Sequence, residues 1–155
     1  MTYQITGLSP QSFSTLIGAD DATLAAARAT RVRATADSGF PCRISLRDAK
    51  AGESLILLHH TSHDVATPYR SSYAIYVREN ATQAAHYADA VPPVFEGRPL
   101  GLRGFDASGM LRAALLALPD QADARIREMF ENREIAYIDA HNAAHGCFAA
   151  RVERG

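Results

Sequence analysis

The run Leu55-Ile56-Leu57-Leu58 constrains the fold more than any other stretch of the chain. Consecutive apolar residues within residues 54–59 predict a β-strand that is buried on both faces, because a half-exposed strand alternates apolar and polar side chains. Residues 74–77, Ala-Ile-Tyr-Val, predict a second strand. We expect the first of these strands to be central in its sheet, since only a strand with neighbours on every side can bury such a run.

The connection between these two strands, residues 59–72, is long and rich in titratable groups. These groups are His59, His60, His63, Asp64, Tyr69 and Arg70. Connections in compact domains are commonly about 4–6 residues long, and longer ones without regular structure are often binding loops. We therefore expect residues 59–72 to form the rim of a binding site.

Chain length and charge limit the classes of protein that this sequence can encode. The 155 residues fit one globular domain over residues 1–155. Sixteen basic and 17 acidic residues give a net charge of -1, so the chain lacks the excess positive charge that binds nucleic acid or an anionic membrane. Residues 1–6 do not resemble a secretory signal, and no apolar stretch approaches the ~20 residues that span a bilayer. We expect a cytoplasmic protein without nucleic-acid or membrane partners.

The remaining sequence predicts short helices. Ser9-Pro10 and Asp20 are N-terminal capping signals for two short helices. Residues 119–131 predict another helix, whose apolar stripe consists of Ile126, Met129 and Phe130. Residues 81–90 also have a helical composition, although Pro92 follows them closely.

Further strands are predicted in consecutive pairs. They cover residues 31–35, 42–46, 100–105, 110–116, 135–139 and 147–152. Alternation within residues 42–46 would place Cys42 on one face and Arg43 on the other. Because strands follow one another rather than alternating with helices, we predict an α+β fold with a mainly antiparallel sheet and helices packed on one side.

Several short motifs resemble a known family in combination. They are Pro41-Cys42-Arg43, Gly52-Glu53 before the apolar strand, Pro68-Tyr69-Arg70 before the second strand, Arg103-Gly104-Phe105-Asp106 with Gly109, and Asn142 with Gly146-Cys147-Phe148. Over nearly its whole length the chain resembles the bacterial family named domain of unknown function 1203. The resemblance implies a stand-alone bacterial domain and assigns no catalytic role to any residue.

Neither the histidines nor the short motifs indicate a metal ion or a cofactor. His59 and His60 are adjacent, so on a strand their side chains point to opposite faces. His141 and His145 lack the glutamate that follows the first histidine of a zinc-protease helix. Gly-rich nucleotide loops and the nucleophile motif of common hydrolases are also missing. We expect no metal and no cofactor, and the sequence leaves open whether the protein is an enzyme.

The two cysteines, Cys42 and Cys147, are too few for a disulfide framework. A nucleophilic cysteine needs a nearby cation or helix N-terminus and a base within reach. Free cysteines are among the most buried residue types. We expect both thiols to be reduced, unbridged and without a catalytic role.

The arginines indicate anion binding most directly. Arg43, Arg70 and Arg103 each lie beside a turn or loop signal, and a guanidinium forms paired hydrogen bonds with carboxylates and phosphates. The candidate ligand-binding residues are Arg43, His63, Tyr69, Arg70, Arg103 and Asn142. His63 is also the candidate acid or base, because imidazole exchanges protons near neutral pH. Alternatively, Arg70 pairs with Asp64 and Arg103 pairs with Asp106 as structural ion pairs.

Two functions therefore stay open. The chain either binds, or acts on, a small anionic molecule in a pocket rimmed by residues 59–72, or it is a protein-interaction or structural module without catalytic activity. A concave pocket that holds Arg43, His63 and Arg70 favours the first function. A flat apolar surface, or a sheet edge paired with a second copy in a homodimer, favours the second.

Overall fold

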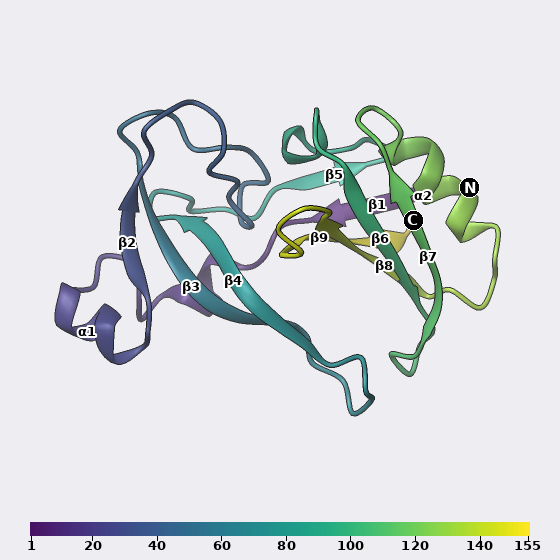
Figure 1. Cartoon of the computed structure of the whole chain (residues 1–155), viewed down its shortest axis with the longest axis horizontal. Helices are drawn as coiled ribbons and strands as arrows, with labels where there is room; N and C mark the ends of the chain where they lie inside the picture. The colour runs from purple at the N-terminus through teal and green to yellow at the C-terminus, as the bar shows by residue number, and fades with distance from the viewer.

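The computed structural model describes residues 1–155 and contains two antiparallel β-sheets and two short α-helices. Figure 1 shows the smaller sheet with α1 at one end of the molecule, and the larger sheet with α2 at the other. The two chain termini lie together beside the larger sheet, where the Gly155 amide donates to the Thr2 carbonyl at 3.0 Å. No helix combines the length and the apolar character that crossing a membrane requires.

The larger sheet has the strand order β5-β1-β9-β8-β6-β7, and all of its pairings are antiparallel. Its strands are β1 (Tyr3–Thr6), β5 (His86–Ala88), β6 (Leu100–Phe105), β7 (Leu111–Ala117), β8 (Tyr137–Asn142) and β9 (Phe148–Arg154). The hairpin predicted around Gly109 is confirmed, and this glycine has a φ of +86° in the turn. The closing strand pair is also confirmed, as β8 and β9.

The smaller sheet has the order β2-β3-β4 and contains the apolar run. Its strands are β2 (Thr30–Arg33), β3 (Ser54–His63) and β4 (Ser71–Arg78). As predicted, β3 is central and buried on both faces: Leu55 packs with one apolar cluster, and Ile56 and Leu58 pack with another. Residues 59–72 are not a loop along their whole length. Pairing between β3 and β4 continues from His59–Ala74 to His63–Ser71, which leaves only residues 64–70 as the connection.

The two helices cover different sheets, so the expectation of one sheet with helices on one side differs from the structure. Helix α1 (Asp21–Ala26) contacts β2, and the Asp20 carboxylate accepts from the Thr23 amide at 2.8 Å as the predicted cap. Helix α2 (Ala122–Phe130) contacts β6 and β7. Its predicted stripe of Ile126, Met129 and Phe130 is buried in the core of the larger sheet. The coarser prediction holds, because the fold is mainly antiparallel sheet with a few helical turns.

The predicted strand over residues 42–46 is wrong. The Leu46 amide bonds back to the Cys42 carbonyl at 3.0 Å, and Leu46 has a φ of +52°, so the backbone forms a compact turn. Consequently Cys42, Arg43 and Ile44 are all buried and do not alternate between faces. The turn is anchored by the Arg43 amide, which donates to Tyr76 on the outer edge of β4 at 3.1 Å.

The predicted helix over residues 81–90 is also wrong, since this segment contains β5. Pairing of β5 with β1 overrides the helical composition, as tertiary context commonly does. The N-terminal strand β1 was not predicted. It pairs with β5 and β9, and only these distant partners make its four residues part of a sheet.

The chain crosses between the sheets at a close backbone contact. It leaves the larger sheet at Gly7 and returns at Ala85, and the Gly7 amide donates to the Ala85 carbonyl at 2.8 Å. The Ala85 amide in turn donates to Ile44 at 2.9 Å. A Cβ atom on Gly7 would collide with the Ile44 carbonyl, so only glycine permits this approach. All of the smaller sheet is thus inserted between β1 and β5.

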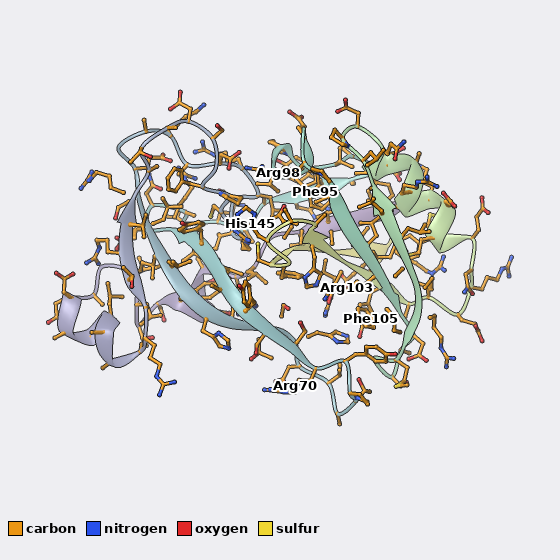
Figure 2. The ribbon with its side chains drawn as sticks, in the orientation of Figure 1. Arg70, Phe95, Arg98, Arg103, Phe105 and His145 are labelled. Carbon is orange, nitrogen blue, oxygen red and sulfur yellow. The ribbon has the colours of Figure 1, made fainter.

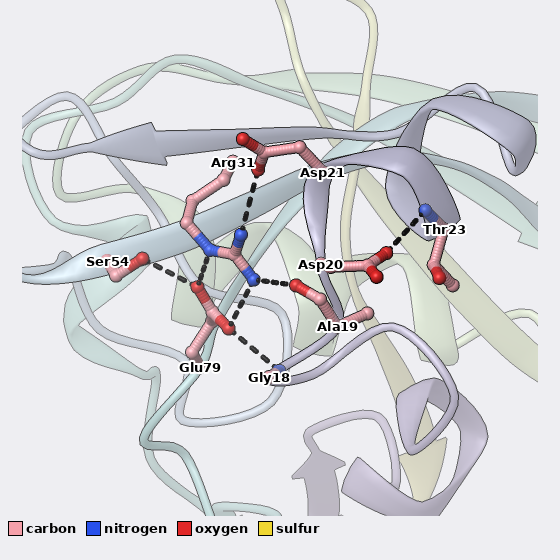
Figure 3. Close-up of polar contacts among 8 residues, drawn as sticks. All are labelled: Gly18, Ala19, Asp20, Asp21, Thr23, Arg31, Ser54 and Glu79. Atoms are coloured by element: carbon pink, nitrogen blue, oxygen red, sulfur yellow. Dashed lines mark hydrogen bonds and ion pairs between the residues drawn. The ribbon is translucent and has the colours of Figure 1, made fainter.

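Glu79, immediately after β4, ties the smaller sheet to the segment before α1 (Figure 3). Its carboxylate accepts from Arg31 Nε on β2 at 2.6 Å, from the Ser54 hydroxyl at 2.6 Å and from the Gly18 amide at 2.9 Å. The hydrogen bonds from Arg31, assisted by Ser54 and Gly18 and opposed by burial, lower the pKa of Glu79 to about 2. The ionised carboxylate is therefore the form that stabilises the fold.

Replacement of Ile56 should test whether β3 is the core of the smaller sheet. Ile56→Ala removes a fully buried side chain and should lower the free energy of unfolding by about 2–5 kcal/mol in urea titrations. Leu57→Ala, at the neighbouring and partly exposed position, should lower the free energy of unfolding by a clearly smaller amount. Equal losses for the two variants would contradict the assignment of their faces.

Replacement of Glu79 should have a pH-dependent effect. Its pKa in the folded protein lies below the ordinary value of 4.5, so its contribution is present above about pH 4.5 and is lost as the pH falls toward 2. Glu79→Gln should therefore lower the free energy of unfolding at pH 7 and much less at pH 3. The exposed Glu134, which forms no ion pair, supplies the control Glu134→Gln. A pH-independent loss for Glu79→Gln would contradict this role.

Candidate functional site

A cavity of about 440 Å³ lies between the two sheets and is lined by segments that are far apart in the sequence. These segments are the turn before β3, the facing parts of β3 and β4, the residues before β6, and the β8–β9 turn. The lining residues are Gly39, Pro41, Arg43, Leu57, Tyr73, Ala74, Ile75, Tyr76, Arg98, Pro99, Asn142, Ala143, Ala144, His145 and Cys147. Figure 2 shows Arg98 and His145 near the middle of the molecule, where the two sheets meet. The lining contains no aspartate or glutamate.

Arg43 supplies a buried positive charge to the cavity wall. Only 2% of its surface is exposed, and it forms no ion pair with any carboxylate. Its guanidinium donates to the Phe148 carbonyl at 2.8 Å, to the Pro41 carbonyl at 2.6 Å and to Cys147 Sγ at 3.1 Å. A guanidinium has five N–H donors, so two of them have no partner within the protein. A buried cation without a counter-charge is costly, which makes this position unusual for a purely structural arginine.

Asn142 lies at the end of β8 and is 8% exposed. Its Nδ2 donates to Cys147 Sγ at 3.4 Å, whereas its buried Oδ1 has no hydrogen-bond partner. Buried amide oxygens are nearly always paired, since leaving one unpaired costs about 1–3 kcal/mol. Asn142 and Arg43 donate to the same sulfur atom, so the two side chains lie next to each other on the cavity wall.

The β8–β9 turn holds Cys147 and His145 at the cavity. The Gly146 amide donates to the Asn142 carbonyl at 2.8 Å, and Gly146 has a φ of +76°, a conformation that favours glycine. The Ala143 amide donates to Pro99 at 3.0 Å and so attaches the turn to the segment before β6. The turn is therefore held at both ends while His145 stays exposed and Cys147 stays partly exposed.

The electrostatics of the cavity are dominated by Arg43. The other arginine in the lining, Arg98, is neutralised by Asp48, to which it donates at 2.8 and 3.0 Å. Burial lowers the pKa of Arg43, and the neighbouring Cys147 acts in the opposite direction. The cavity thus offers one buried cation without a carboxylate partner, beside an unpaired amide oxygen and among apolar side chains.

Of the residues predicted from the sequence, Arg43 and Asn142 lie together at the cavity, and the others lie elsewhere. Arg70 is at the far end of the β3–β4 hairpin in Figure 2, exposed and paired with Asp64 at 3.0 Å, which was the alternative that we considered for it. Arg103 on β6 is half-buried and forms no ion pair. The alternative partner Asp106 instead pairs with Arg112 at 2.7 Å.

His63 and Tyr69 lie between the hairpin and the larger sheet rather than at the cavity. His63 is 1% exposed and stacks on Phe105 with ring centroids 4.0 Å apart. Its Nδ1 is 2.8 Å from the Tyr69 carbonyl oxygen, and its Nε2 is 2.7 Å from the Tyr137 hydroxyl. Both ring nitrogens are occupied, so in this structure the imidazole connects the hairpin to β8.

A buried ion pair strengthens the same junction. Arg151 on β9 donates to the fully buried Asp139 on β8 at 2.7 and 3.0 Å. The Arg151 guanidinium also lies 4.4 Å from the centre of the Tyr137 ring and donates to the Ser62 carbonyl at 3.3 Å. This cluster holds the end of β3 against the larger sheet. It joins the two sheets at the part of their interface that lies away from the cavity.

Most other residues of the cavity lining, including Arg98, His145 and Cys147, were not predicted as site residues from the sequence. Both cysteines are free, as predicted, and Cys42 is buried as predicted, but Cys147 is partly exposed in the cavity lining. Its nearness to Asn142 follows from the hairpin, whereas its contact with Arg43 joins residues 104 positions apart. No group of three or more His, Cys, Asp or Glu side chains is placed to hold a metal ion.

A family model described as "Protein of unknown function (DUF1203)" matches residues 39–154. The matched segment includes every residue of the cavity lining. Neither a search of curated proteins nor a search of solved structures returned a match.

Removal of the Tyr137 hydroxyl should show whether His63 joins the hairpin to the larger sheet. Tyr137→Phe leaves buried Nε2 without a partner and should lower the free energy of unfolding by about 1–3 kcal/mol. Tyr87→Phe, at a half-buried tyrosine whose hydroxyl forms no hydrogen bond, is the matched control. If both variants unfold at the same urea concentration, the hydrogen bond does not hold the junction.

Proposed function

The chain belongs to the DUF1203 family of proteins of unknown function, and we propose that it binds a small anionic molecule in the cavity between its two sheets. The observation that carries this proposal is the guanidinium of Arg43, which is buried at the cavity wall without a carboxylate partner. A carboxylate or phosphate bound there would supply the missing negative charge and accept the two unused N–H donors.

The cavity also suggests the rest of the ligand. Asn142 Oδ1 needs a hydrogen-bond donor, so the molecule should carry a hydroxyl or an amide N–H close to its acidic group. Leu57, Ile75 and Pro99 would contact an apolar portion. A volume of about 440 Å³ suits a small metabolite, since ligand pockets span roughly 300–1,000 Å³. With the cytoplasmic location expected from the sequence, the ligand would be a cytoplasmic metabolite.

We assign ligand binding to Arg43 and Asn142, with His145 at the rim. His63, Tyr69, Arg70 and Arg103 do not line the cavity, so this proposal gives them no direct contact with the ligand. Binding is the core of the proposal, and it does not require His63 to act as an acid or a base.

The alternative function, a protein-interaction module, is supported by one edge of the larger sheet. Strand β7 has no neighbour on its outer side, and Leu116 on this strand and Leu118 just beyond it are among the most exposed large apolar residues. A free edge with exposed leucines is the kind of surface on which a second copy of the chain could add a strand. This alternative requires no ligand in the cavity.

Asn142→Asp should separate the two functions. The aspartate keeps the size of the side chain but places a negative charge beside Arg43, in the position that we assign to the ligand. In a thermal-shift screen of short mono- and dicarboxylates, sugar phosphates and inorganic phosphate, we expect at least one anion to stabilise the wild type. A ligand at ~100 times its dissociation constant adds about 2.7 kcal/mol to native stability. The same anion should not stabilise Asn142→Asp.

Asn132→Asp is the matched control, because it adds the same charge at an exposed position remote from the cavity. This variant should respond to the anion like the wild type. If no anion stabilises the wild type, or if Asn142→Asp responds equally well, the cavity does not bind anions and the interaction module becomes the better account.

A further inference from the structure

We propose that Cys147 is a nucleophilic cysteine that exchanges with low-molecular-weight anionic disulfides inside the cavity. The inference rests on the proposed function in one respect, because it takes the cavity to be one that admits an anion. It goes beyond that function by assigning a covalent reaction to the site.

Two hydrogen-bond donors are directed at the sulfur atom of Cys147. Cys147 Sγ accepts from Arg43 Nη2 at 3.1 Å and from Asn142 Nδ2 at 3.4 Å. Both donor residues are more than nine-tenths buried, so these contacts are part of the packed wall of the cavity. A thiolate accepts such hydrogen bonds strongly, whereas a neutral thiol is a weak acceptor.

The sulfur atom also lies beside a positive charge that has no carboxylate partner. No carboxylate is paired with Arg43, and the nearest group that can become negative is the Cys147 thiol. A cation beside a cysteine is the usual environment of a nucleophilic thiol in proteins.

Small molecules can reach Cys147 from the cavity. Cys147 is partly exposed and lines the cavity beside Asn142, whose buried Oδ1 has no partner within the protein. Cys42 provides the contrast within the same protein. Its sulfur also accepts backbone hydrogen bonds, from Ile44, Ser45 and Arg78, but it is 1% exposed and does not line the cavity.

The reaction needs only the disulfide as a partner. The Cys147 thiolate attacks one sulfur of the molecule R–S–S–R, the bond between the two sulfur atoms breaks, and a bond forms between Cys147 and one half. The other half leaves as R–S⁻, so charge and electrons balance. Because no second cysteine lines the cavity, the product is a mixed disulfide on Cys147, and a free small thiol restores the protein by the reverse exchange.

The cavity should select the charge of the disulfide. Arg43 is the lining cation without a carboxylate partner, and no acidic residue lines the cavity, so a carboxylate is favoured there over an ammonium group. We therefore expect a dianionic disulfide to react in preference to a dicationic one of similar size.

The test uses the full chain and two unactivated alkyl disulfides, the dianion 3,3'-dithiodipropionate and the dication cystamine. Each rate is divided by the rate of the same reagent with the N-acetylcysteine amide thiol at pH 7. Intact-mass measurement should show one adduct on Cys147, formed roughly tenfold or more faster with the dianion after this normalisation. Cys42→Ala should give the same adduct, and Cys147→Ala should give none.

Alkylation by neutral iodoacetamide measures the reactivity of the thiol independently of the anion site, because the rate of alkylation by an uncharged reagent does not depend on anion binding. Wild type should be alkylated at Cys147 roughly tenfold faster than the reference thiol at pH 7, since only the thiolate reacts. A slower rate, or modification at Cys42 instead, overturns the thiolate even if anions stabilise the protein. Fast alkylation without any preference between the disulfides supports the thiolate and overturns the anion-binding cavity.

Arg43 acts as a positioning residue in this proposal, and its effect has a spectroscopic readout. The far-ultraviolet absorbance of a thiolate should be present in the wild type and absent in Cys147→Ala. It should be stronger in Arg43→Lys, which keeps the positive charge, than in Arg43→Gln, which removes it. If Arg43→Gln does not fold, Asn142→Leu provides the second test, because it removes one donor to the sulfur and should lower the alkylation rate. Unchanged absorbance and rate in both variants would overturn the role of these donors.

Discussion

The hydrogen bonds of the Arg43 guanidinium are the interaction on which the rest of the structure depends. It belongs to a turn of the smaller half of the molecule, yet it donates to the Phe148 carbonyl on β9 of the larger sheet. A buried guanidinium requires acceptors in fixed directions, so this contact restricts how the two halves can be placed beside the cavity. The space that remains beside it is the cavity, whose walls come from both sheets.

The two ends of the interface between the sheets differ in how their polar groups are satisfied. At the hairpin end, Arg151 meets Asp139, and His63 has a partner at each ring nitrogen. At the cavity end, Arg43 has no carboxylate and Asn142 has an unpaired oxygen. Folding tolerates such incomplete pairing mainly where another molecule can complete it. The contrast within one interface supports the proposed binding site more strongly than either residue does alone.

Local patterns were sufficient to predict several of the elements, but not all of them and not how they assemble. The apolar run at Leu55, the α2 stripe and the turn at Gly109 depend on neighbours in the sequence, and each was predicted correctly. Strand β1, the turn at Arg43 and the division into two sheets depend on contacts between residues far apart, for which a single sequence carries no signal. Arg43 and Asn142 were identified by residue type and by nearby turn signals. Their meeting at Cys147 required the fold, because Arg43 and Cys147 are separated by 104 positions.

Because the smaller sheet is inserted between β1 and β5, the segment that the family model matches is shorter than the segment that forms the two complete sheets. The family match begins at residue 39, whereas β1, α1 and β2 all precede it. A protein cut at that boundary would keep the whole cavity lining but lose the only partner of β5, one neighbour each of β9 and β3, and the arginine that neutralises Glu79. Boundaries taken from sequence similarity would therefore yield a fragment with three newly exposed strand edges.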